Sequence, residues 1–323
     1  MTEASEGTFG GLVDDDNDDR AMVEALRPAV DALMGLVTAY EDTVRSSGGL
    51  PAADAPGIGE LAEQHRFANE AWKQPVDNAH SLISLLTYSG VDQTRGFAHL
   101  FAQAPTPTYA HLVLARAALE AFGTCSWLSE PGIGTAIRIK RSLVIELDDA
   151  LNRKRYGVPE VRAKGAEILA ELRRGGTIAG WPIIANNHRQ VVDGVSAPPM
   201  GDLFALAVGP DGLTDPSAGA GTTFKSVWSY LSGVAHGCTF ALFQSLLPSD
   251  SETPIDGLAR MDLTTNSLSV HIMATALASA AVTCIDRVFG LMGWRDPRWN
   301  NAKAACQPWI TAVLQAQGAT DAS

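Results

Sequence analysis

Two long stretches of this sequence are apolar on nearly every side when they are read as helices. They cover residues 107–129 and 264–292. A helix without a polar face has to lie inside a protein, surrounded by other helices. Along most of the remaining chain, hydrophobic residues recur at spacings of three and four, and no alternation bounded by hairpin turns interrupts them. The sequence therefore predicts an all-α fold, a multi-helix bundle that is larger than a simple four-helix layer.

Glycine and proline divide the chain into helices and loops. Gly48-Gly49 ends the first helix, and Gly90 ends the third. Residues 175–198 and 209–220 are rich in glycine and proline, and we expect both to be loops. The expected helices cover residues 22–47, 59–72, 75–90, 92–102, 107–129, 134–156, 159–174, 200–208, 221–247, 264–292 and 298–316.

The net charge of −12 is concentrated at the N-terminus, where the first 24 residues carry −7 and leave −5 for the rest. Alternating aspartates between residues 14 and 18 resemble a calcium loop, but the glycine and the glutamate that such a loop needs are missing. We expect a disordered acidic tail at 1–18, N-terminal helices at 19–104 and the bundle core at 105–317. A mildly acidic body excludes attraction of the whole molecule to DNA or anionic lipid.

Cysteine usage and the N-terminus both indicate a cytoplasmic protein. Cys125, Cys238, Cys284 and Cys306 form no Cys-x-x-Cys motif and lie in apolar helical contexts, which is typical of buried reduced thiols. The N-terminus lacks the basic and apolar regions of a signal peptide. The apolar run at 272–285 is shorter than the ~20 residues of a bilayer span. The sequence therefore predicts no membrane partner.

The first candidate site lies on the apolar stretch 107–129. Tyr109, Arg116, Glu120 and Trp127 fall within one stripe of about 60° on a helix. Arg116 and Glu120 are four residues apart and can pair. Because few other polar residues share this helix, we expect the pair to be buried or to line a cleft. It is either an ion pair that joins helices or a group that orients an anion or substrate.

The second candidate is His236, with Ser232 one turn before it. Gly233 and Gly237 flank the histidine, and glycine inside a helix costs up to ~1 kcal/mol against alanine. This arrangement favours close approach of another backbone. His236 is either a buried histidine bonded to Ser232 or a carbonyl, or a general base that contacts a ligand. The same glycine face would let two copies of the chain form a homodimer.

A basic segment follows these helices along the chain. Residues 138–174 hold ten basic and six acidic residues, a net charge of +4, and they begin with Arg138 and Arg141. The segment is either a phosphate or RNA face or a solvated helix pair with mixed charge. We find no paired Glu-x-x-His segments, no glycine-rich phosphate loop, no Gly-x-Ser-x-Gly elbow and no dinucleotide motif. No metal and no cofactor is therefore expected.

These motifs together resemble a group of bacterial helical proteins that are similar to the HEPN superfamily, named for higher eukaryotes and prokaryotes nucleotide-binding. The resemblance covers residues 107–292 and implies an up-and-down helical bundle, often dimeric, whose members include ribonuclease toxins and inactive binding proteins. The residues that carry it are His111, Arg116, Glu120, Trp127-Leu-Ser-Glu-Pro131, Arg138-x-x-Arg141 and Tyr230-Leu-Ser232-Gly-Val-Ala-His236-Gly237.

The sequence departs from the active members of that superfamily at one position. Their mark is an arginine and a histidine separated by four to six residues, and Ser229, Tyr230 and Leu231 occupy the corresponding positions before His236. We therefore predict a protein that binds a small molecule, a nucleotide or a partner in a cleft. Alternatives are a metal-independent ribonuclease that acts on RNA and a dimerisation module. The expected catalytic residues are His236, Arg116 and Glu120, and the expected ligand-binding residues are Ser232, Tyr109, Arg138 and Arg141.

Overall fold

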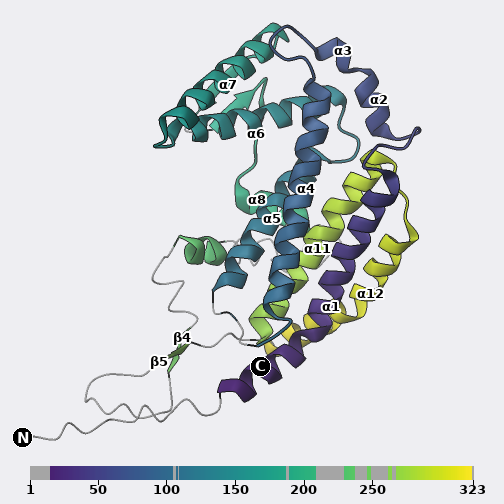
Figure 1. Ribbon diagram of the computed structural model, residues 1–323, viewed down its shortest axis with the longest axis vertical. Coiled ribbons are helices and arrows are strands. Elements are labelled where there is room, and N and C mark those ends of the chain that lie inside the picture. The colour runs from purple at the N-terminus through teal and green to yellow at the C-terminus, as the bar shows by residue number, and fades with distance from the viewer. Residues whose placement is uncertain are drawn as a thin grey trace, which may run out of the picture.

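A computed structural model describes residues 15–104, 107, 109–186, 189–208, 229–236, 246–248, 261–263 and 267–321 (Figure 1). Most of these residues are helical, which confirms the predicted all-α class. The helices are α1 (Asp15–Ser47), α2 (Pro56–Ala62), α3 (Gln64–Phe67), α4 (Pro75–Leu100), α5 (Ala110–Leu128), α6 (Thr135–Arg155), α7 (Pro159–Ile178), α8 (Met200–Val208), α11 (Ser267–Met292) and α12 (Pro297–Asp321). Residues 229–235 form a further short helical segment.

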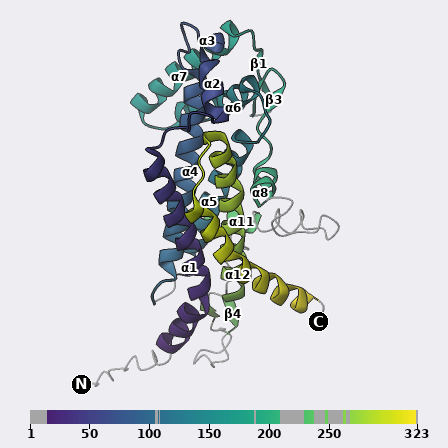
Figure 2. The ribbon, with the colours of Figure 1, turned by 90° about the vertical axis from the view of Figure 1, so that its right-hand side faces the viewer.

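The main core joins α1, α4, α5, α8, α11 and α12, and Figures 1 and 2 show the long helices α1, α4, α5 and α11 side by side along the molecule. Helix α5 contacts α4, α8 and α11, and most of its residues are buried. The two apolar stretches therefore lie inside the bundle, as predicted. Three of the cysteines (Cys125, Cys284 and Cys306) are buried free thiols, while Cys238 lies outside the described residues.

Helix α4 is one continuous helix where the sequence predicted two, and the prediction was wrong at Gly90. A Cβ atom at Gly90 would lie 2.6 Å from Cε1 of the buried Phe122 on α5. The glycine is therefore needed for close contact between the two helices, and it does not end α4. The predicted helix at 59–72 was also wrong, because α2 and α3 are two short helices and the chain is irregular after Phe67.

Short strands were missing from the prediction. The strands β1 (Ile183–Asn186), β2 (Arg189–Val192) and β3 (Val195–Ser196) form an antiparallel sheet in the region expected to be a loop. Asp193-Gly194 connects β2 to β3 with φ angles of 47° and 79°, as a two-residue hairpin requires. A second pair, β4 (Leu246–Pro248) with β5 (Met261–Leu263), shows that the helix predicted at 221–247 does not reach residue 247.

A second core lies at the end of the molecule, where α6 and α7 form a helical hairpin across the end of α4 (Figure 1). Trp72, which follows α3, packs here against apolar residues of both helices. Val192 of β2 is fully buried in the same cluster. The small sheet therefore closes this core, and the hairpin is held by its own apolar contacts as well as by α4.

Helix α11 contains the only described stretch, Val270–Met292, that is long and apolar enough to cross a membrane. It is longer than the run at 272–285 that the sequence suggested, because the helix continues past Asp286 and Arg287. Within the bundle, 72% of its most apolar window is buried. Such burial is what a core helix needs, because an all-round apolar surface is covered by neighbouring helices.

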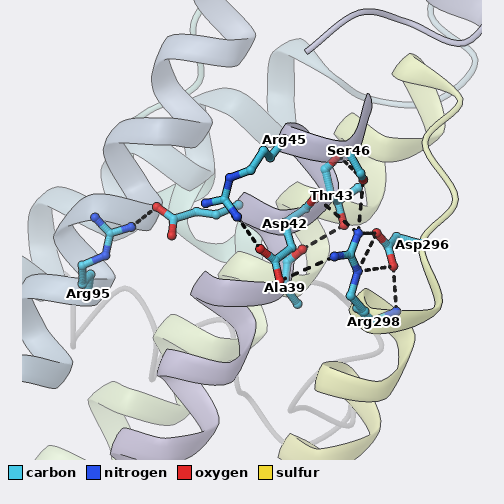
Figure 3. Close-up of polar contacts among 9 residues, drawn as sticks. Ala39, Asp42, Thr43, Arg45, Ser46, Arg95, Asp296 and Arg298 are labelled. Carbon is cyan, nitrogen blue, oxygen red and sulfur yellow. Dashed lines mark hydrogen bonds and ion pairs between the residues drawn. The ribbon is translucent and has the colours of Figure 1, made fainter. Parts of the chain in front are cut away.

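Charged residues fasten the start of α12 and the side of α4 to α1 (Figure 3). Arg298 contacts Asp296 at 2.6 Å and Asp42 of α1 at 3.6 Å. The hydrogen bond from Arg298 lowers the pKa of Asp296 to about 2. On the other side of α1, Glu41 pairs with Arg95 of α4. Each of these acids has a cationic partner, so the cluster is explained by packing between helices.

Candidate functional site

Arg116 and Glu120 form the ion pair that their spacing predicts. The Nε atom of Arg116 donates to Oε1 of Glu120 at 2.8 Å, and the side chains are 17% and 29% exposed. The pair is therefore half-buried on α5. Glu120 also lines a cavity, so its charged side chain borders a space that a ligand can enter.

This cavity has a volume of about 510 Å³ and lies among α4, α5, α6, β2 and α8. Its size is within the range of ~300–1,000 Å³ that is typical of small-molecule sites. Its acidic and polar lining residues, which we call the acidic wall, are Glu120, Asp148, Asp149 and Asn152, and Arg189 of β2 is its one basic lining residue. Its apolar lining residues, which we call the apolar wall, are Leu86, Ala121, Ile145, Ala197, Pro198, Pro199, Met200 and Leu203, and Thr124 adds a hydroxyl group to the lining.

Two local features give the cavity its shape. A Cβ atom at Gly123 would lie 2.7 Å from the carbonyl oxygen of Leu203, so glycine allows α8 to pack directly on α5. Pro198-Pro199 precedes α8, and the carbonyl of Pro199 accepts hydrogen bonds from Asp202 and Leu203. Because proline restricts its own φ angle and the residue before it, this segment holds the apolar wall in one conformation.

The carboxyl groups of the acidic wall have different surroundings. Burial raises the pKa of Asp148, while a hydrogen bond from the Gln190 backbone and the charge of Arg189 partly oppose the rise. Asp149 is exposed and also pairs at 2.7 Å with Arg153, which does not line the cavity. Both aspartates belong to the segment 138–174, which the sequence predicted to be either a phosphate or RNA face or a solvated helix pair with mixed charge. The feature of the sequence that could have pointed to these lining residues is the grouping of Asp148, Asp149 and Asn152 within five residues of α6.

The structure brings Ser232 to Arg116, but through the backbone. The Nη1 atom of Arg116 donates to the Ser232 carbonyl at 3.5 Å, so the segment 229–236 lies beside α5. The His236 amide donates to the same carbonyl at 3.1 Å. The interpretation of His236 as a buried histidine was wrong, because the residue is exposed. Gly237, needed for the predicted close-contact face, lies outside the described residues.

Tyr109 and His111 lie at the start of α5 and belong to the core. Tyr109 is the N-cap residue of the helix and packs partly buried against the main core. His111 is buried between the rings of Phe97 and Phe101, with centroid distances of 6.2 Å and 5.2 Å. Burial lowers the pKa of His111 to about 4, despite a hydrogen bond with the Pro107 backbone that raises it. His111 is therefore neutral near pH 7.

Arg138 and Arg141, predicted to bind a ligand, instead contact the C-terminus of α5. Carbonyl groups in the last turn of a helix lack intrahelical donors, and cations there also interact favourably with the helix dipole. Twelve residues of helix separate Arg116 from this end, which is about 18 Å along the axis. The three guanidinium–carbonyl pairs are Arg287 with Ser126, Arg141 with Trp127, and Arg138 with Leu128.

Arg138 also belongs to a buried charged cluster with Glu60 and His80. Its Nε atom donates to both carboxylate oxygens of Glu60, at 3.1 Å and 2.9 Å, and His80 contacts the same carboxylate at 2.9 Å. Burial raises the pKa of Glu60, but the bonds and charges of His80 and Arg138 outweigh it and lower the pKa overall. Glu60 is therefore ionised, and the cluster joins α2, α4 and α6.

The described residues contain no group of three or more histidine, cysteine, aspartate or glutamate side chains that could hold a metal ion. A smaller cavity of about 310 Å³ lies between α4, α6 and α7, lined by Trp72, Asn78 and Glu146 among others. Burial raises the pKa of Glu146, and Ser142 donates to its carboxylate at 2.7 Å.

No family model, curated protein or solved structure matches this chain. The resemblance to the HEPN superfamily, the cytoplasmic location and the homodimer therefore stay predictions. The structure brings together Arg116, Glu120 and the Ser232 backbone, and it places Arg138 and Arg141 at the other end of α5.

Proposed function

We propose that the protein binds a small organic molecule in the cavity among α5, α6 and α8. The observation that carries this proposal is one cavity whose lining combines three carboxyl groups with apolar side chains of α4, α5, α6 and α8. A cavity of this kind can bury an apolar body while a few polar groups orient it. Arg116 holds the Glu120 carboxylate in place at the edge, as a positioning residue.

The charges of the lining favour a ligand that donates hydrogen bonds or carries a positive charge. Three carboxyl groups and one guanidinium line the cavity, so an amine gains charge-assisted hydrogen bonds there. A nucleotide phosphate would face the like charges of Glu120, Asp148 and Asp149. Among the ligand classes expected from the sequence, the small molecule is therefore favoured over the nucleotide.

A fragment screen followed by thermal unfolding tests this proposal. We expect amines with an apolar body to raise the melting temperature and adenosine monophosphate to leave it unchanged. The double variant Glu120→Gln/Asp148→Asn removes two carboxylates while keeping side-chain size. Because a hydrogen bond to a charged group contributes about 1.5–3 kcal/mol, we expect amine binding to weaken about 10- to 100-fold or more. Isothermal calorimetry measures this change.

Glu24→Gln provides the matched control, because Glu24 is exposed on α1 and does not line the cavity. It should leave the affinity for the same amines unchanged. Equal affinity of the double variant and the natural protein would show that the acidic wall does not bind these ligands. Tighter binding of adenosine monophosphate than of the amines would contradict the proposed ligand class.

A metal-independent ribonuclease is the second candidate, supported by the approach of Arg116 to the segment that carries His236. Against it, the Arg116 guanidinium is already paired with Glu120. We therefore expect the purified protein to leave total RNA intact on a denaturing gel. Cleavage that disappears in both His236→Ala and Arg116→Ala, with unfolding temperatures unchanged, would establish the ribonuclease instead.

A further inference from the structure

The turn between α6 and α7 displays three apolar side chains to solvent. Tyr156, Val158 and Val161 are 61%, 53% and 39% exposed. They fall within six consecutive residues at the end of the α6–α7 hairpin, which extends to one side of the molecule (Figure 1). We call residues 153–164 the hairpin tip. Exposed apolar groups gathered in one place indicate an interaction surface more strongly than single exposed residues do.

The same residues are strongly basic. The hairpin tip has five basic residues and one acidic residue, a net charge of +4, in a chain whose net charge is −12. The remaining residues therefore carry −16. Two of the tip cations have partners further back along the helices, since Arg153 pairs with Asp149 and Lys164 with Glu167. Both pairs are exposed and contribute little attraction, so the end of the hairpin stays positive.

Hydrogen bonds across the turn and a close contact between the two helices support the hairpin tip. Arg162 donates to the carbonyls of Tyr156 and Gly157 at 3.3 Å and 3.5 Å, across the turn. A Cβ atom at Gly165 would lie 2.6 Å from the backbone nitrogen of Lys154, so α6 and α7 are in direct backbone contact below the turn. The tip therefore presents its side chains on a well-supported hairpin.

We propose that the hairpin tip docks the protein on an anionic lipid surface. Tyrosine is enriched at the level of lipid headgroups, where aliphatic side chains next to it can enter the acyl region. Lysine and arginine around them meet the headgroup phosphates, and each contributes about 1 kcal/mol, or about five-fold in partition. A nucleic acid would satisfy the cations but offers no apolar region for Val158 and Val161. The combination of basic residues and exposed apolar side chains therefore favours an anionic lipid surface over a nucleic acid.

Docking through the hairpin tip is peripheral, and it is compatible with a sequence that lacks a predicted spanning segment and is acidic as a whole. The expectation of no membrane partner rested on the absence of a spanning segment and on the acidity of the whole molecule. A docking tip needs neither a span nor a basic protein. The strongly negative remainder of the chain is repelled by an anionic surface, and it therefore turns the tip toward the membrane. The proposal is independent of the ligand cavity.

Co-sedimentation of the full chain with vesicles tests the proposal. We expect binding to vesicles of phosphatidylcholine mixed with phosphatidylglycerol and no binding to phosphatidylcholine alone. Binding should fall steeply between about 0.05 M and about 0.5 M NaCl, because salt screens charges at an exposed surface. Lys154→Glu/Arg155→Glu removes two cations, so we expect partition to fall at least about 25-fold. Tyr156→Ser/Val158→Ser should reduce it at least about ten-fold.

Matched controls separate the tip from the rest of the surface. Arg20→Glu/Arg27→Glu changes the same charge at exposed positions of α1, and Leu85→Ser removes a side chain of α4 that is 64% exposed. Both should leave partition within about two-fold of the natural protein. Circular dichroism should show that all variants stay folded, since every changed residue is exposed.

Three outcomes would overturn the proposal. The first is no binding to the anionic vesicles at low salt. The second is equal binding by the tip variants and the α1 and α4 controls. The third is binding to single-stranded polyuridylate that requires Lys154 and Arg155 while the vesicles stay unbound, because this would make the hairpin tip a nucleic-acid surface.

Discussion

Replacing Arg138 with leucine lowers the free energy of unfolding by about 3–5 kcal/mol. The substitution leaves the Glu60 carboxylate buried with only His80 beside it, and it removes the donor to the Leu128 carbonyl at the end of α5. A buried charge without its partner keeps the cost of leaving water but loses the attraction that compensates for it. Urea unfolding monitored by circular dichroism measures the loss.

Two further variants show that the loss comes from the broken pair. Arg45→Leu breaks an exposed pair with Asp42, and we expect a change below about 1 kcal/mol. Arg138→Leu/Glu60→Leu removes both charges and should be more stable than Arg138→Leu alone. A single variant within about 1 kcal/mol of the natural protein would contradict the structural role. Loss of amine binding in a folded Arg138→Leu protein would restore the sequence prediction that Arg138 binds ligand.

The free energy of unfolding falls by about 3 kcal/mol between pH 7 and pH 4 because of His111. The pKa of its imidazole is 6.5 in the unfolded chain and about 4 in the fold, since burial disfavours the charged form. Between these values the unfolded state binds more protons, so stability is present above pH 6.5 and is lost as the pH falls toward 4. Urea unfolding at a series of pH values measures the slope.

His111→Phe removes this titration while keeping a ring next to Phe97 and Phe101. The variant should lose less stability between pH 7 and pH 4 than the natural protein. A part of the slope remains in the variant, because the lowered pKa of Glu60 and the lowered pKa of His271 also destabilise the fold in acid. Identical slopes for the two proteins would contradict a lowered pKa of His111 in the fold.

Local patterns predicted the helices well because the relevant interactions are close in sequence. The apolar stretch 107–129 could only be an internal helix, and it is α5 at residues 110–128. Arg116 and Glu120 pair within one turn, so spacing alone was enough to predict that contact. Asp193-Gly194 carried a hairpin signal that was overlooked, because strands of two to four residues show no extended alternation.

Long-range contacts could not be predicted in the same way. Gly90 has the same appearance in the sequence whether it ends a helix or admits a neighbouring ring, and only the position of Phe122 shows which. Asp148 and Arg189 face one cavity although about forty residues lie between them. The exposure of His236 likewise depends on which helices pack against its segment. In each case the deciding atoms come from another element.

The sequence by itself determined that the chain is helical, which two helices are internal, and which side chains pair within a turn, because these follow from periodicity and from neighbours three or four residues away. Only the tertiary structure decided the role of Arg138, whose partner Glu60 is 78 residues distant, and the place of Glu120 at the edge of a cavity. The physical reason is that electrostatic interactions and burial depend on distances in space. Folding brings these groups together, and their separation along the sequence does not indicate that they will be close.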